Sequence, residues 1–136
     1  MKDTKLLIVD DEAVFTLLLK RIFRKLGYHV CEPVATGEAA IQVALQEKPD
    51  VVLMDIRLVG AMDGVAAATR ILESHQVPII FMTGYADEAT ESRARALKPA
   101  ALLTKPVTPE DILPVLNTLF PPTGTDRIPA PAGLPK

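Results

Sequence analysis

The sequence has little cysteine and no long run of apolar residues. Its one cysteine, Cys31, excludes an internal disulfide and is typical of a protein from a reducing compartment. No apolar stretch reaches the roughly 20 residues that a membrane-spanning helix needs. Residues 1–5 lead directly into a short apolar run and lack the pattern of a signal peptide. We therefore expect a cytoplasmic protein without a membrane partner.

An excess of charge of either sign is also missing. The chain carries 15 Lys and Arg against 17 Asp and Glu, a net charge of -2, so its charge does not indicate direct binding of nucleic acid. Apolar residues make up 49% and charged residues 24%, as in one soluble globular domain. Residues 121–136 differ because they are rich in proline, which blocks regular structure. The sequence predicts a folded domain over residues 1–120 and then a disordered Pro-rich tail or the start of a linker.

Short apolar segments alternate with segments of helical spacing along the folded part. We predict strands at 5–9, 28–34, 51–54, 79–82 and 101–103. Helices are expected at 12–26, between Thr36 and Pro49, after Gly64, at 87–97, and from Thr108 or Pro109 to near Phe120. This order implies a right-handed, doubly wound α/β sandwich of five strands and five helices.

Two of the helices carry more specific predictions. Gly27 should end the first helix in a left-handed conformation. Pro114 lies within the last helix and predicts a kink or an early end, because proline cannot donate a backbone hydrogen bond. The apolar residues at helical spacing on the first helix are Phe15, Leu18, Leu19, Ile22 and Leu26.

Polar side chains stand at the ends of four predicted strands. Asp10 and Asp11 follow the first strand, and Asp55 follows the third. Thr83 and Lys105 follow the fourth and fifth. The carboxyl ends of parallel strands meet at one edge of the sheet, where ligands bind. This edge therefore gathers three carboxylates, a hydroxyl and an ammonium, which predicts a site for a cation and a phosphate.

The residue types at this edge favour phosphoryl chemistry with a hard cation. Mg²⁺ prefers oxygen ligands, and the histidines and Cys31, which would suit a transition metal, do not cluster here. A carboxylate can attack a phosphoryl group and form an acyl phosphate. Lys105 and the Thr83 hydroxyl could neutralise the phosphoryl oxygens, and Gly84 leaves room for the group. Each feature alone has an ordinary explanation, such as a helix cap or a turn, but the combination at one edge favours a site.

Neither common glycine-rich phosphate loop, G-x-G-x-x-G or G-K-[ST], is present. Instead the chain resembles the receiver domain of bacterial two-component response regulators over about residues 5–120, through the motifs LLIVDDE, VVLMDIRL, MDG, IIFMTGYAD and LLTKPV. The resemblance implies a flavodoxin-like doubly wound parallel sheet with strand order 2-1-3-4-5 and five helices. It also implies a signalling phosphoacceptor, which is an enzyme only toward its own aspartyl phosphorylation and dephosphorylation.

The resemblance assigns a role to each residue of the edge. Asp55 would accept a phosphoryl group from a histidine kinase or a histidine phosphotransfer protein. Thr83 and Lys105 would contact the phosphoryl oxygens, and Pro106, after a cis peptide bond, would help aim the lysine. The ligands of Mg²⁺ would be Asp11 and Asp55 directly, Asp10 through water, and the backbone carbonyl of Arg57.

Two segments depart from the family pattern. Leu102 stands where the family usually has Tyr or Phe, so the ring that commonly reports the state of the site is missing. Residues 58–61 lack the usual Met-Pro, and Gly64 comes one residue later after Asp55 than is common. We expect a slightly longer loop with the same metal geometry.

Four further residues are assigned to tuning or partner binding. Arg57 and Tyr85 each follow a site residue by two positions, where the family's side chains flank the attacking water. We predict that they set the lifetime of the phosphoryl group. Phe15 and Leu18 belong to a surplus of apolar residues on the first helix, where the family docks histidine-bearing helices. Packing against the last helix explains this surplus equally well.

Two other functions remain open at this point. A phosphate-independent, receiver-like interaction module is favoured by Leu102 but opposed by the complete set of site residues. A magnesium-dependent phosphatase would carry a second aspartate two residues after Asp55, where this chain has Arg57. A phosphorylation-dependent homodimer is neither indicated nor excluded by any residue pattern. No motif identifies the kinase or the target, or separates a single-domain regulator from part of a longer one.

Overall fold

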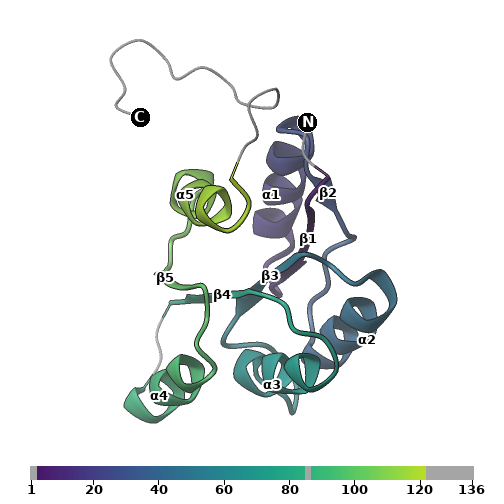
Figure 1. The fold of residues 1–136 in the computed structure, drawn as a ribbon. Helices are drawn as coiled ribbons and strands as arrows, with labels where there is room; N and C mark the ends of the chain where they lie inside the picture. Colours follow the sequence, from purple (N-terminus) through teal and green to yellow (C-terminus); the bar gives the residue numbers. More distant parts are fainter. Residues whose placement is uncertain (1–2, 85–86, 122–136) are drawn as a thin grey trace.

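A computed structural model describes residues 3–84 and 87–121 (Figure 1). The predicted tail, apart from Pro121, lies outside the described residues, as does Tyr85. The strands are β1 (Lys5–Val9), β2 (His29–Val30), β3 (Val51–Asp55), β4 (Ile79–Thr83) and β5 (Ala101–Thr104). The helices are α1 (Ala13–Lys25), α2 (Gly37–Glu47), α3 (Gly64–Ser74), α4 (Glu88–Ala96) and α5 (Pro109–Leu119).

The five strands form one parallel sheet in the order β2-β1-β3-β4-β5. In Figure 1 the sheet lies between α1 and α5 on one side and α2, α3 and α4 on the other. This arrangement confirms the predicted doubly wound, flavodoxin-like fold. It also brings the carboxyl ends of β1, β3 and β4 to a common edge.

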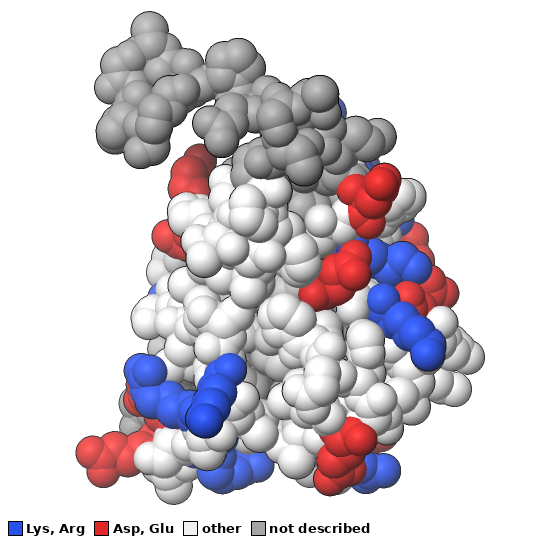
Figure 2. Space-filling view, viewed as in Figure 1, with Lys and Arg blue, Asp and Glu red and all other residues white. Residues whose placement is uncertain are grey.

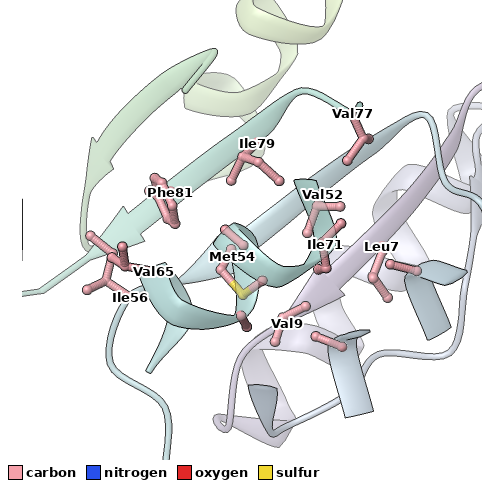
Figure 3. Close-up of a cluster of buried hydrophobic side chains, with 14 of the residues drawn as sticks. Leu7, Val9, Val52, Met54, Ile56, Val65, Ile71, Val77, Ile79 and Phe81 are labelled. Atoms are coloured by element: carbon pink, nitrogen blue, oxygen red, sulfur yellow. The ribbon is translucent and has the colours of Figure 1, made fainter. Parts of the chain in front are cut away.

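The central strands are apolar up to the polar residue at the end of β3 and of β4, because both faces of the sheet are covered. Alternate side chains point to opposite faces. Leu7, Val52 and Phe81 pack with residues of α2, α3 and α4, and Figure 3 shows part of this cluster. Leu6 and Leu53 belong to the second cluster, with residues of α1 and α5. Two cores of similar extent therefore hold the strands that carry the polar edge.

The buried face of α1 includes only part of the apolar stripe seen in the sequence. Leu19 is 2% exposed and Phe23 is fully buried, whereas Leu18 is 53% exposed. Ile22 and Leu26 are also exposed. The buried residues of α1 are Thr16, Leu19 and Phe23, while Phe15 is partly buried beside them. Packing on the sheet therefore selects between two overlapping stripes.

Two further details of the elements are corrected. Strand β2 covers only His29–Val30, although the prediction extended to Val34. Pro33 cannot donate to a ladder, and the chain rejoins β1 only at an isolated bridge between Val34 and Val9. Pro114 does not end α5 early, because the helix continues to Leu119 and the Phe120 amide still donates to the Leu116 carbonyl. The left-handed Gly27 is confirmed, with φ of 99°.

Candidate functional site

The predicted edge residues do come together. Asp55 and Thr83 are the last residues of β3 and β4, and Asp10 follows β1 directly. Although these side chains are polar, Asp10 is 3% exposed, Asp55 4% and Thr83 9%. Buried polar groups are costly unless they are paired, so each requires a partner or a ligand.

Three carboxylates at this edge form a cluster suited to a cation. Asp10, Asp11 and Asp55 each offer one oxygen, and these oxygens lie within 4.8 Å of one another. Asp11 is exposed at the mouth of the cluster, while Asp10 and Asp55 form its floor. An all-oxygen donor set with an open side fits a hard divalent ion such as Mg²⁺, which keeps some of its waters.

Backbone amides fix one oxygen of each buried carboxylate. The Glu12 amide donates to Asp10 Oδ1 at 2.9 Å, and the Arg57 amide donates to Asp55 Oδ1 at 3.1 Å. Both donors lie two residues beyond their acceptor, in the first turn of the chain after each strand. The second oxygen of each carboxylate therefore faces the site.

Lys105 joins the two buried carboxylates. Its Nζ donates to Asp10 Oδ2 at 2.9 Å and to Asp55 Oδ2 at 3.2 Å, and it lies 3.5 Å from Glu12 Oε1. Burial lowers the pKa of Lys105, but the hydrogen bond and charge of Asp10 and the charge of Asp55 outweigh it and raise the pKa above its ordinary value. Lys105 is therefore an ammonium at neutral pH. The Lys105-Pro106 bond is cis, as predicted.

The surroundings of Asp55 disfavour the ionised form of its carboxyl. Burial raises the pKa of its carboxyl to about 6, and the negative charge of Asp10 acts in the same direction. The charge and hydrogen bond of Lys105, with the amide of Arg57, oppose the rise. At neutral pH Asp55 is mostly ionised, and a cation held by the cluster would lower this pKa further because an opposite charge favours the carboxylate.

Thr83 is the one residue whose buried polar side-chain atom has no partner among the residues that the structure describes. Its Oγ1 is buried and makes no hydrogen bond within residues 3–84 and 87–121. Leaving such a group unpaired costs about 1–3 kcal/mol. The hydroxyl is thus available to a ligand at the edge. This is the strongest single indication that the site is built to receive an oxygen-rich group.

Two glycines near the site differ in the space available for a side chain. A Cβ at Gly84 would lie 3.9 Å from Lys105 Cδ, an ordinary contact, and the room that Gly84 leaves for a phosphoryl group stays a prediction. A Cβ at Gly64 would overlap the carbonyl oxygen of Asp55. Gly64 also donates its amide to the Ile56 carbonyl at 2.7 Å. It closes the loop after β3, a role that sequence spacing alone did not reveal.

The remaining predicted residues surround the site more loosely. Phe15 and Pro106, with Glu12, Lys105 and Val107, line a groove of about 400 Å³. The ring of Phe15 lies 5.7 Å from Lys105 Nζ, within the range of a cation–π contact. Leu18 is exposed on α1 outside this groove.

Two other sequence candidates differ in exposure. Arg57 is exposed beside Asp55. Leu102 is partly buried and packs against the core on the α2–α4 side of the sheet. Within the described ranges, no helix is long and apolar enough to cross a membrane.

Fold and edge together define a class: a doubly wound α/β signalling domain with an acidic site that can accept a phosphoryl group. The chain belongs to the response regulator receiver domain family, whose model matches residues 6–117. In this family an aspartate accepts a phosphoryl group within two-component signalling. Membership therefore supports a phosphorylatable receiver and does not favour the phosphate-independent alternative.

Individual relatives agree with this assignment. The chain is 31% identical over 113 residues to the transcriptional regulatory protein PdtaR of Mycobacterium tuberculosis, covering 83% of this chain and 55% of that protein. It is similar to the signal receiver domain of a modulated diguanylate cyclase from Desulfovibrio desulfuricans (TM-score 0.80, 34% identity, 87% and 94% covered).

A third relative carries a metal. The receiver domain of sensor histidine kinase PA1611 of Pseudomonas aeruginosa, solved with a magnesium ion coordinated in the active site cleft, gives a TM-score of 0.74 at 28% identity, with 87% and 98% covered. By contrast, the chain spans only about half the length of PdtaR and of the next curated relative.

Proposed function

We propose that the chain accepts a phosphoryl group on Asp55 from the phosphohistidine of a histidine kinase or histidine phosphotransfer protein, and that this modification switches a protein-interaction surface. The observation that carries the proposal is the buried Asp55 carboxylate, which belongs to the acidic cluster and is bound by Lys105, with the unpartnered hydroxyl of Thr83 at the end of the neighbouring strand β4. Each group has a separate task in phosphoryl transfer.

Asp55 is the nucleophile of this reaction. Its Oδ1 is held by the Arg57 amide, which leaves Oδ2 on the side of Lys105. An oxygen of the carboxylate forms a bond to phosphorus while the bond between phosphorus and the donor's imidazole nitrogen breaks, and the imidazole takes a proton. A pKa of about 6 leaves the carboxylate ionised at neutral pH.

The acidic cluster would hold the cation that accompanies the transfer. We assign Asp10, Asp11, Asp55 and the backbone carbonyl of Arg57 to Mg²⁺, since the carboxylate oxygens already lie within 4.8 Å of one another. When bound, the ion supplies positive charge to the phosphoryl oxygens. Asp10 and Asp11 keep this charge beside the acceptor.

Lys105 and Thr83 would bind the remaining phosphoryl oxygens. Lys105 already contacts Asp55 and has only to shift its ammonium from the Asp10 oxygen. Thr83 supplies a hydroxyl donor that has no competing partner in the described part of the chain. The phosphoryl group adds roughly -1.5 to -2 charges near pH 7, which favours movement of both groups toward it.

Loss of the phosphoryl group is assigned to water, with Arg57 and Tyr85 flanking its path. We expect an Arg57→Ala, Tyr85→Ala double variant to change the rate of dephosphorylation more than the stability of the fold. The measurement is the decay of the phosphorylated form by intact mass. Equal decay rates in the variant and the wild type would exclude this role.

The surface that changes with phosphorylation would be formed by α4, β5 and α5. Histidine-bearing helices of the phosphoryl donor would bind along α1. Phe15 lines the groove beside Lys105, so it is placed to contact a donor near the site, and the exposed Leu18 extends the apolar surface along α1. Leu102 packs into the core, so the readout must work without an aromatic ring on β5. A phosphorylation-dependent homodimer through α4 and α5 is part of the same prediction.

The test is intact mass after incubation with Mg²⁺ and a small acyl-phosphate donor. We expect one phosphoryl adduct on the wild type and none on Asp55→Asn. Asp50→Asn is the control, because Asp50 is an exposed aspartate whose carboxylate accepts from the Lys5 amide, far from the edge. An adduct on Asp55→Asn, or none on the wild type, would overturn the assignment.

A further inference from the structure

Helix α4 is attached to the rest of the domain by few apolar contacts. Of its residues Glu88–Ala96, Ala94 is the only one buried. The helix is strongly polar, and one of its ion pairs, Arg95 to Glu91 at 2.9 Å, stays within the helix. Figure 2 shows basic and acidic side chains side by side at the lower left, where Figure 1 places α4. With one buried side chain in α4, polar contacts are available to fix its position.

One ion pair links α4 to another element. Arg93 Nη1 donates to Asp63 Oδ2 at 3.0 Å, and Nη2 lies 3.5 Å from Oδ1. Asp63 is also the N-cap of α3, where its Oδ1 accepts from the Ala66 amide at 2.8 Å. Burial raises the pKa of Asp63, but the hydrogen bonds from Arg93 and Ala66 outweigh it, and the pKa lies below its ordinary value. The carboxylate is thus ionised and fixed from two sides.

The position of Asp63 depends directly on the acceptor strand. Residues 56–63 form the loop that leaves Asp55, and the next residue, Gly64, closes it by donating to the Ile56 carbonyl at 2.7 Å. The backbone of Gly64 also approaches the Asp55 carbonyl so closely that no side chain fits between them. A displacement of the backbone after Asp55 is therefore transmitted to Asp63 within one short, closed loop.

We propose that Arg93 is a positioning residue that holds α4 to the loop after Asp55. A backbone displacement caused by phosphorylation of Asp55 would then change the position of α4 through the Asp63–Arg93 ion pair. This proposal rests on the proposed function. It supplies a route to α4 in a chain where Leu102 provides no ring on β5. Because Arg93 and Asp63 lie thirty positions apart in the sequence, the pair links two elements rather than stabilising one.

The test compares amide hydrogen exchange in α4 with and without beryllofluoride and Mg²⁺, a mimic of the phosphoryl group. The readout is the exchange rate with the mimic divided by the rate without it, for residues 91–97. A purely local stabilisation of α4 would change both rates equally and leave this ratio unaltered. Exposed ion pairs change an equilibrium by about 1.5- to fivefold. We expect Arg93→Ala to bring the wild-type ratio closer to one by a factor in this range. Arg93→Lys should restore part of the wild-type effect.

Two control variants separate the link from ordinary helix stability. Arg95→Ala removes an ion pair of similar exposure that stays within α4, and it should leave the ratio unchanged. Asp63→Asn keeps the capping oxygen but removes the charge, and it should bring the ratio closer to one as Arg93→Ala does. A wild-type ratio of one, or equal ratios in Arg93→Ala and Arg95→Ala, would overturn the proposal.

Binding of the mimic is followed separately by fluorine NMR. A bound fluorine signal with an unaltered ratio in Arg93→Ala would overturn the role of Arg93 alone. Absence of a bound signal from the wild type would overturn the proposed function together with it. The two failures are therefore distinguishable in one set of samples.

Discussion

The charge of Asp55 is expected to destabilise the fold, and replacing it should make the protein more stable. Burial and the neighbouring Asp10 raise the pKa of Asp55 from 3.8 to about 6. At about 1.4 kcal/mol per pH unit, this rise corresponds to about 3 kcal/mol of unfavourable free energy for the ionised form. Asp55 is 4% exposed, so solvent screens little of this cost.

The sign of the pH dependence follows from proton binding. Between pH 4 and about 6 the folded protein retains a proton on Asp55 that the unfolded chain has largely lost. Stability falls with rising pH wherever the folded state binds more protons. The contribution of Asp55 should therefore decrease through this window and stay low above it. Lys105, whose raised pKa lies far above this window, adds no slope there.

The assay is urea unfolding of the wild type and Asp55→Asn from pH 4 to 8 with a chelator present. We expect the variant to be more stable at pH 8, by up to about 3 kcal/mol, and the difference to shrink toward pH 4. Asp3→Asn controls for the loss of one exposed charge. A difference that is constant with pH, or that grows toward acid pH, would refute the reasoning.

Three further outcomes follow from the packing and the site. Phe23→Ala should cost about 3–5 kcal/mol in urea unfolding, whereas Leu18→Ala, on the exposed stripe, should stay within about 0.5 kcal/mol; equal costs would contradict the observed face of α1. Gly64→Ala should lose about 1–3 kcal/mol through overpacking against the Asp55 carbonyl, while Gly84→Ala should lose little. Lys105→Met should bind Mg²⁺ several-fold more tightly by calorimetry, since its ammonium no longer competes with the ion for the carboxylates. A smaller fraction of this variant should become phosphorylated. Weaker Mg²⁺ binding would contradict the idea that Lys105 and Mg²⁺ compete.

The sheet and its polar edge could be predicted because the information is local. Each central strand is a short apolar run that ends in a polar residue, and the alternation with helices determines which ends meet. The side chains of Asp10 and Asp55 therefore meet at Lys105 as expected, and Thr83 ends the neighbouring strand β4. The inward face of α1 could not be predicted in the same way, because Leu18 and Leu19 both fit a helical stripe and only packing distinguishes them.

Other features depend on contacts between distant segments. The Asp63–Arg93 pair has no local signal, since each residue is an ordinary helix residue or cap when seen alone. The double contact of Lys105 with Asp10 and Asp55 likewise requires the assembled edge. The unpartnered hydroxyl of Thr83 is also visible only once its surroundings are known.

The stability cost and the expected metal affinity have a common origin. Among the residues that the structure describes, Asp10 and Asp55 share a single ammonium, that of Lys105, which also lies near Glu12, and Asp11 adds a third carboxylate to the cluster. The site therefore keeps an excess of negative charge that further positive charge would compensate. A ligand that binds only the folded state stabilises it by an amount that grows with the logarithm of its concentration divided by its Kd. Mg²⁺ should thus reduce the loss of stability between pH 4 and 6 in the wild type, but much less in Asp55→Asn. If Mg²⁺ left the slope of the wild type unchanged, the excess charge would not be the basis of the cation site.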